Sequence, residues 1–340
     1  PLEDNDFKIF SSTQHPSETQ QIIAKMLNQK NNTINVEVRR IGGGFGGKET
    51  QSLIFAAICT LLSKKTKLPV KLRMDRDDDI IITGKRHDFY SDYEVGFNDK
   101  GVIEGVKIKL ASRCGISPDL SEAINSRALL HIDNAYYLSD VSVENYLCKT
   151  NTSSSTAFRG FGGNQGMMII ENIVDSVATY LKKDPAKIRK VNFYQKNKKN
   201  ITHYGMKIED NVINEIYSKL IKSSNYKNRR LNIKKFNLKN KYLKKGLSLT
   251  PVKFGISFTT RHLNQAGALV HIYCADGSVH VSTGAIEMGQ GTYTKIAMLI
   301  SNELGLPFDK IKVFSTRTDK VPNTSASAAS STTDLNGAAA

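Results

Sequence analysis

The stretch that decides the fold is GGGFGGKE at residues 42–49, which has two counterparts, FRGFGGNQG at 158–166 and EMGQG at 287–291. Each stretch follows an extended segment and precedes an apolar helix. Glycines let the backbone turn sharply and approach a ligand closely, while the first turn of a helix offers free N–H groups and the positive end of a dipole. One such loop is a weak indication. Three in one chain predict a site for one large cofactor.

Hydrophobic periodicity around these loops predicts a mixture of helices and strands. Strands are expected at 34–38 and 69–73 and in two hairpins, 93–97 with 102–110 and 267–272 with 278–282; helices are expected at 50–65, from 163 to about 184, and at 292–304. The resulting fold class is α+β. We expect two mixed α/β lobes, residues 1–195 and 246–340, joined by a basic linker region at 196–245. Because each lobe carries glycine-rich loops, a cofactor is expected between the lobes.

Length and composition indicate a folded protein that is part of a longer one. The 340 residues are 39% apolar, which is ordinary for globular domains. The chain begins at Pro1 and stops at Ala340, so we expect a fragment that is incomplete at both ends. No apolar run approaches the roughly 20 residues of a membrane span, and no signal peptide opens the chain, so a cytoplasmic protein with no membrane partner is expected. The four cysteines show no metal-ligand spacing and are expected to be reduced.

The net charge of +16 comes largely from lysines and arginines between residues 182 and 245. A groove that binds nucleic acid is one interpretation of this charge. The preferred one is a solvated surface linker, because aromatic residues are not interleaved as a stacking surface requires.

The first loop fits two nucleotide-binding signatures incompletely. Gly42, Gly47 and Lys48 match a phosphate-binding P-loop, but Glu49 stands where Ser or Thr should hold magnesium. The glycines also match a dinucleotide fingerprint, yet lysines occupy the region where an acidic residue should bind the ribose. Neither nucleotide reading is preferred.

Several longer motifs carry a family resemblance. They are STQ at 12–14, the loop at 42–49, FRGFGG at 158–163, KFGISFT at 253–259, LNQAGA at 263–268 and EMGQG at 287–291. In this order they resemble the molybdopterin-binding region of eukaryotic xanthine dehydrogenases, in the molybdenum hydroxylase family. The resemblance spans essentially the whole chain. Asn164, where the family usually has proline, and the divergent segment 196–245 depart from it.

The resemblance implies a molybdenum–molybdopterin cofactor in this region. It further implies two 2Fe-2S clusters and FAD in domains outside this fragment, NAD as electron acceptor, and a homodimer in the cytoplasm, with the peroxisome as an alternative location. By matching motif positions, molybdenum-centre contacts are expected from Gln14, Phe45, Arg159 and Ala329, and further cofactor contacts from Gly44, Gly46, Gln290 and Ala328.

The positions that face substrate in the family also suit a purine chemically. Phe161 and Phe258 would hold a flat heterocycle between them. Arg127 can neutralise charge that develops on a purine carbonyl, Glu49 can bond ring nitrogens, and Thr259 adds a polar contact. Aldehyde oxidases generally replace the Glu and the Arg. Taken singly, Glu49 could be a helix N-terminal carboxylate and Arg127 a surface ion pair.

The resulting hypothesis is a fragment of a xanthine dehydrogenase that, in the complete enzyme, hydroxylates hypoxanthine to xanthine and xanthine to urate. Arg127 and Glu49 are the catalytic candidates. The general-base Glu of the family lies beyond residue 340, so the fragment alone is expected to be inactive. An aldehyde oxidase of the same family and a non-catalytic module that binds nucleic acid are the alternatives, although nucleic acid is not the expected partner.

Overall fold

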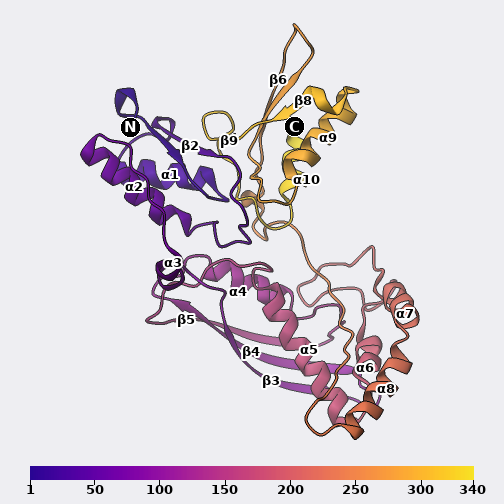
Figure 1. Ribbon diagram of the computed structural model, residues 1–340. Helices are drawn as coiled ribbons and strands as arrows, with labels where there is room; N and C mark the ends of the chain where they lie inside the picture. Colours follow the sequence, from indigo (N-terminus) through magenta and orange to yellow (C-terminus); the bar gives the residue numbers. More distant parts are fainter.

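The computed structural model describes residues 1–340 and has two lobes (Figure 1). The upper lobe in the figure contains both termini. The lower lobe is built from the middle of the chain and carries the segments from α3 to α8. A long connection runs from α8, past α5, back to the upper lobe.

The first sheet of the upper lobe brings the two ends of the chain together. Strand β1 (Phe7–Phe10) is parallel to β2 (Ile34–Val38), and β2 is antiparallel to the short β9 (Thr316–Arg317). Alternate residues of β2 are buried, as the expected strand at 34–38 requires. Helices α1 (Pro16–Leu27) and α2 (Ser52–Thr66) share this core with the first sheet.

A second sheet completes the upper lobe. The hairpin of β6 (Ala268–Ile272) and β7 (Val279–Thr283) is antiparallel, and β8 (Ile311–Val313) is parallel to β7. Helix α9 (Thr292–Leu304) packs against this sheet and contacts α10 (Thr332–Ala339). The expected hairpin and the expected helix at 292–304 are both confirmed.

The lower lobe contains a three-stranded sheet, in which β3 (Phe89–Phe97) is antiparallel to β4 (Ile103–Gly115) and β4 is parallel to β5 (Val141–Lys149). Its largest core lies between this sheet and α5 (Gly163–Tyr180). Buried residues of α5 recur at helical spacing, among them Ile170, Ile173, Val174 and Val177. The remaining helices are α3 (Arg76–Ile82), α4 (Ser121–Leu130), α6 (Pro185–Asn192), α7 (Ile213–Ser223) and α8 (Tyr226–Lys239).

Four short 3₁₀ helices, at Glu3–Asn5, Asn31–Thr33, Arg261–Leu263 and Phe308–Lys310, complete the elements. The mixed α/β class is confirmed. No helix is both long and apolar enough to cross a membrane.

Two features differ from the sequence-based picture. The expected strand at 69–73 is wrong: these residues pair with no strand, and the chain instead enters α3, where the Asp75 side chain accepts a hydrogen bond from Asp78 N at 2.9 Å. The basic segment 196–245 contains α7 and α8, and their Tyr217 and Tyr226 are buried in the core of the lower lobe. The boundaries 1–195, 196–245 and 246–340 stay a prediction. In the structure, the residues before and after the boundaries at 195/196 and 245/246 lie in the same lobe, the lower one (Figure 1).

Candidate functional site

Each glycine-rich loop stands where the sequence placed it, between an extended segment and the start of a helix. The first lies between β2 and α2, the second between β5 and α5, and the third between β7 and α9. A Cβ on Gly44 would lie 2.6 Å from Gln14 Oε1 and 2.8 Å from Met288 Sδ, so the first loop packs directly against the third. A Cβ on Gly46 would lie 3.0 Å from the Ala157 backbone, next to the second loop. The three loops therefore converge.

Gln14 is the central link of this convergence. It is buried between β1 and α1, where its Oε1 accepts a hydrogen bond from Gly46 N at 2.9 Å and its Nε2 donates one to Ser327 O at 3.0 Å. Ser327 in turn accepts a hydrogen bond on its Oγ from Ile286 N at 2.8 Å, just before the third loop. One amide hydrogen of Gln14 remains for a ligand.

The third loop is shaped by its own polar side chains. The Glu287 carboxylate accepts hydrogen bonds from Gly289 N, Gly291 N and Tyr293 N at 2.8 to 3.1 Å. Burial opposes ionisation of Glu287, but these N–H groups outweigh it and hold its pKa below the usual value. Gln290 accepts from Met288 N at 2.6 Å and donates to Ile286 O at 2.8 Å, so its amide closes the loop it belongs to.

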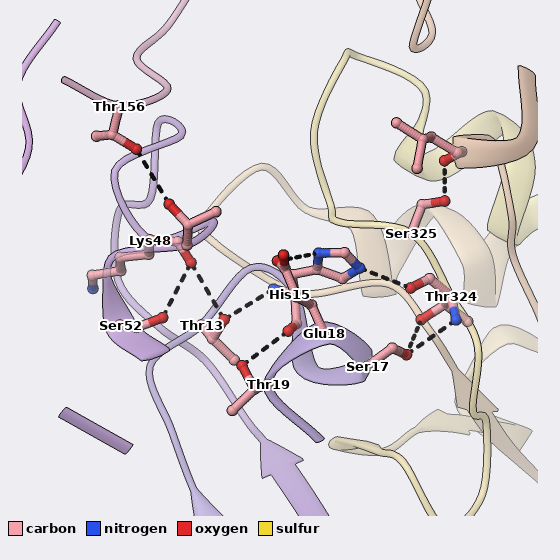
Figure 2. A network of polar contacts seen from close by, with 12 residues as sticks. Thr13, His15, Ser17, Glu18, Thr19, Lys48, Ser52, Thr156, Thr324 and Ser325 are labelled. Carbon is pink, nitrogen blue, oxygen red and sulfur yellow. Dashed lines mark hydrogen bonds and ion pairs between the residues drawn. The ribbon is translucent and has the colours of Figure 1, made fainter. Parts of the chain in front are cut away.

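A polar network holds the segments around the first loop (Figure 2). The His15 ring lies between Glu18 Oε2, 2.9 Å from Nδ1, and Thr324 O, 3.2 Å from Nε2. Ser17 Oγ accepts from Thr324 N at 3.0 Å. The hydroxyls of Thr50 and Thr156 lie 3.3 Å apart, which connects the residues just before α2 to the segment between β5 and the second loop.

Glu49 is buried and its carboxylate makes no hydrogen bond within the chain. Burial is the largest cause that raises the pKa of this carboxyl to about 7, opposed by the charge of His15 and assisted by Glu18 and Asp119. A carboxylate that caps a helix would accept backbone hydrogen bonds and have a lowered pKa. Glu49 does neither, and an unpaired buried carboxyl with a raised pKa is typical of a functional site.

Arg127, near the end of α4, is buried rather than a surface ion pair, and no carboxylate lies within ion-pairing distance. Its Nη1 donates to Gly255 O at 2.8 Å and its Nη2 donates to Ser257 O. Burial lowers its pKa, although the group stays charged. Two of five N–H donors are thus used on backbone, and three remain.

The other expected ligand contacts lie along the same loops. Phe45 is exposed, and the Arg159 guanidinium lies 6.0 Å from its ring centroid without any hydrogen bond or ion pair. Phe161 and Phe258 are half-buried and Thr259 is exposed. The two phenylalanine rings make no direct contact with each other, and Glu49 and Arg127 form no ion pair.

The segment at Ala328 and Ala329 connects the lobes. Ala329 O accepts a hydrogen bond from Ser257 N at 2.8 Å, and Ala328 O accepts one from Ser331 N at 3.3 Å. Ser257 directly precedes Phe258 and Thr259, so this bond fixes the expected substrate-facing residues relative to the loops of the upper lobe.

The polar groups at the converging loops are mainly hydrogen-bond donors. No cluster of three or more His, Cys, Asp or Glu side chains is placed to hold a bare metal ion. Phe45, Phe161 and Ala329 have left-handed φ angles of 55°, 48° and 54°. A left-handed residue next to a right-handed one can turn successive backbone N–H groups towards one anion. Gln14, with one free amide hydrogen, and Arg159, which makes no hydrogen bond or ion pair within the chain, lie at the same loops, so the donor set fits a large polar cofactor with anionic groups.

Sequence reasoning missed the polar residues that hold residues 251–257 in place. Asn134 Nδ2 donates to Pro251 O at 2.9 Å, His131 Nε2 accepts from Gly255 N at 3.1 Å, and Asp133 pairs with Lys253 at 2.6 Å. No periodicity or spacing marks these residues, because their partners lie more than 100 positions further along the chain.

Comparison with known proteins agrees with this geometry. Two family models, both described as molybdopterin cofactor-binding domain, match residues 1–193 and 219–340. The chain is 45% identical over 337 residues to xanthine dehydrogenase/oxidase from Gallus gallus, and 42% identical over 339 residues to xanthine dehydrogenase from Dictyostelium discoideum. These alignments cover 99% and 100% of this chain but 25% of each relative, so the chain spans about a quarter of their length.

Solved structures with low sequence identity share the fold. Quinoline 2-oxidoreductase from Pseudomonas putida 86 matches with a TM-score of 0.81 at 21% identity, covering 98% of this chain and 44% of that protein. A Cu,Mo-CO dehydrogenase matches with a TM-score of 0.85 at 21% identity, again covering 98% and 44%. The aldehyde oxidoreductase from Desulfovibrio gigas gives 0.79 at 20% identity, covering 97% and 35%.

Proposed function

The chain belongs to the molybdopterin cofactor-binding domain family, and on that premise we propose that it forms the substrate-facing part of a xanthine dehydrogenase. In the complete enzyme the reaction would convert hypoxanthine to xanthine and xanthine to urate. The observation that carries the proposal is the pair Glu49 and Arg127: both side chains are buried beside the converging loops, and neither has a partner of opposite charge.

Such a pair suits a purine better than a simple aldehyde. A purine presents ring nitrogens and carbonyl oxygens that need polar partners once they leave water. The raised pKa lets Glu49 donate a hydrogen bond as a neutral acid or accept one as a carboxylate near neutral pH. The free N–H groups of Arg127 can stabilise negative charge that develops on a carbonyl oxygen.

The cofactor would be held by Gln14, Phe45, Arg159, Gln290 and Ala329, with Gly44, Gly46 and Ala328 allowing the close approach of backbone. When bound, molybdenum–molybdopterin supplies the two-electron oxidation and the oxygen transfer. Residues of this chain would orient the substrate: Phe161 and Phe258 on its two faces, Thr259 on its edge. We propose that the general base is a Glu supplied from outside residues 1–340.

The proposal includes the parts that the longer relatives imply. We propose that 2Fe-2S clusters and FAD, in other domains of the complete polypeptide, receive the electrons and pass them to NAD. A homodimer in the cytoplasm is the proposed form.

The test is expression of the complete polypeptide in a host that makes the cofactor, followed by measurement of molybdenum content and xanthine-dependent urate formation. Molybdenum together with urate formation supports the proposal. Molybdenum with turnover of aldehydes alone would assign the protein to the aldehyde oxidases. Salt-sensitive binding of RNA or DNA with no molybdenum would favour a nucleic-acid-binding module on the basic segment.

A further inference from the structure

Residues 251–257 form an extended segment that belongs to no helix or strand, although they run through the lower lobe beside α5 (Figure 1). An extended backbone has peptide groups that must be paired where water is excluded. Here the pairing comes from side chains. Asn134, His131 and Arg127 bond the backbone of residues 251, 253, 255 and 257, so that every second residue is held.

This spacing of two is the spacing of a β-strand against a neighbouring strand. Lys253 N donates to Asn134 Oδ1 at 3.1 Å, Gly255 N donates to His131 Nε2 at 3.1 Å, and Gly255 O accepts from Arg127 Nη1 at 2.8 Å. Residues 127–134 thus take the place of a partner strand. We call residues 127–134 the clasp and residues 251–257 the strap.

The strap ends at the expected purine contacts. Ser257 has a left-handed φ of 73°, which is costly for a residue with a side chain and persists only where neighbours enforce it. Arg127 holds its carbonyl and Ala329 O holds its N–H. Phe258 and Thr259 follow this turn directly, so a shift of the strap would move both side chains.

The one ionic contact between clasp and strap is Asp133 with Lys253. Asp133 is completely buried, and its Oδ2 accepts from Lys253 Nζ at 2.6 Å and from Tyr194 Oη at 2.6 Å. His203 Nδ1 lies 3.8 Å from the same oxygen. A buried carboxylate is stable only when it is paired, so Asp133 depends on Lys253, and their contact anchors the strap at residue 253.

We infer that Asp133 is a positioning residue for substrate recognition, acting through Lys253 on the strap and thereby on Phe258 and Thr259. The inference rests on the proposed function for its catalytic consequence. The mechanical part, that the clasp orders the strap, stands on the contacts alone.

The test compares Asp133→Asn with Asp184→Asn in the complete holoenzyme. Asn keeps the shape of Asp133 and an oxygen for Tyr194 but loses the charge that pairs with Lys253. Asp184 is a matched control in the same lobe, since its carboxylate likewise meets a tyrosine hydroxyl, Tyr226 at 3.1 Å, and a cation, Arg230 at 3.3 Å. If Asp133→Asn does not fold, Lys253→Gln replaces it as the test variant, because it removes the same ion pair at the residue that is partly exposed.

Hydrogen–deuterium exchange of peptides covering 251–260 measures how well the strap is ordered, and this measurement does not depend on catalytic activity. Asp133→Asn should speed this exchange and raise KM for xanthine roughly tenfold or more, because a small misplacement of contact residues weakens binding geometry. KM for a small aldehyde, which does not need the two aromatic rings, should change little, and molybdenum content should stay that of the wild type. Asp184→Asn should leave exchange at 251–260 and both KM values unchanged.

Unchanged exchange at 251–260 in Asp133→Asn and in Lys253→Gln would overturn the inference. Faster exchange with an unchanged KM for xanthine would also overturn it, because the strap would then be ordered without positioning substrate. If wild-type enzyme forms no urate, the proposed function fails separately, and the exchange of 251–260 alone decides whether the clasp orders the strap.

Discussion

Gln14 and Ser327 lie 313 positions apart in the chain and exchange two hydrogen bonds. Ser327 N donates to Gln14 O at 2.9 Å, and Gln14 Nε2 donates to Ser327 O at 3.0 Å. Because Gln14 also accepts from Gly46 N, one buried side chain ties the first loop to the segment that carries Ala328 and Ala329.

Gln14→Ala should therefore reduce both stability and cofactor loading. The change leaves Ser327 O without a partner in a buried position, which costs about 1–3 kcal/mol, and it also removes the acceptor of Gly46 N in a half-buried position, at a smaller cost. Thermal unfolding of the complete enzyme and its molybdenum content provide the measurements. Gln21→Ala, on the exposed face of α1, is the control and should change neither. Full molybdenum content in Gln14→Ala would remove Gln14 from the cofactor site.

The Glu49 carboxyl should titrate near neutral pH. Its pKa is raised to about 7 by burial, so the group is neutral below that pH and ionised above it. Difference infrared spectra of wild type against Glu49→Gln, recorded across this range, should show a carboxyl band that disappears with a midpoint near 7. A midpoint at the ordinary glutamate pKa would mean that water or a charge partner reaches Glu49. Glu49→Gln should also lower kcat/KM for xanthine by about a hundredfold, as for loss of one preorganised polar contact.

Arg127→Lys should damage purine turnover despite keeping the charge. A lysine cannot bond two backbone carbonyls in the fork that Arg127 makes with Gly255 and Ser257. Loss of kcat/KM for xanthine of about 10²–10³ is expected, with a much smaller loss for aldehydes. Arg113→Lys, an exposed residue of β4 paired with Asp88, is the control. Equal losses on purines and aldehydes would contradict the purine assignment.

Gly162→Ala should prevent normal folding of the second loop. Gly162 has φ +93°, and an added Cβ would collide with the carbonyl oxygen of Ile124. Gly205 is a matched control, because it has φ +84° with nothing within 4 Å of its Cβ position. Gly205→Ala should cost about 1–2 kcal/mol, the penalty for a left-handed conformation alone, whereas Gly162→Ala should cost several more. The yield of folded protein and the Tm distinguish the two. Equal Tm values would show that α4 can move away from the loop.

Local signals predicted the elements that flank the glycine-rich loops and the two hairpins, namely α2, α5, α9, β2, β3, β4, β6 and β7, but not the remaining helices and strands. The bounds of α9 were predicted from the glycine-rich loop before it and from Gly305 and Pro307 after it, and in the structure Gly291 and Gly305 both have left-handed φ angles at its ends. The strand expected at 69–73 failed because alternation cannot show whether a partner strand exists. Strand β9 has two residues, too few for any periodic pattern, and it depends on β2 for its existence.

The site was predictable where short motifs carry it and not where it depends on distant contacts. Glu49 and Arg127 were named from their motif positions and from the chemistry of a purine, but their burial and their lack of charge partners emerge only from the packing of the two lobes. Asp133 and Lys253 lie 120 positions apart. No local sequence pattern predicts that the buried carboxylate of Asp133 pairs with the Lys253 ammonium.

The closure of the upper lobe sets an order of assembly during synthesis. Val36 N donates to Thr318 Oγ1 at 2.9 Å across a separation of 282 residues, and β2 needs β9 to complete its pairing. A ribosome therefore releases the whole lower lobe before the first strands can acquire their last neighbour. Contacts of such long range slow folding, and the early exposed edge of β2 needs protection from aggregation in the meantime. Truncation shortly before Thr316 should therefore destabilise the amino-terminal strands β1 and β2, which lie at the other end of the sequence, more than the lower lobe.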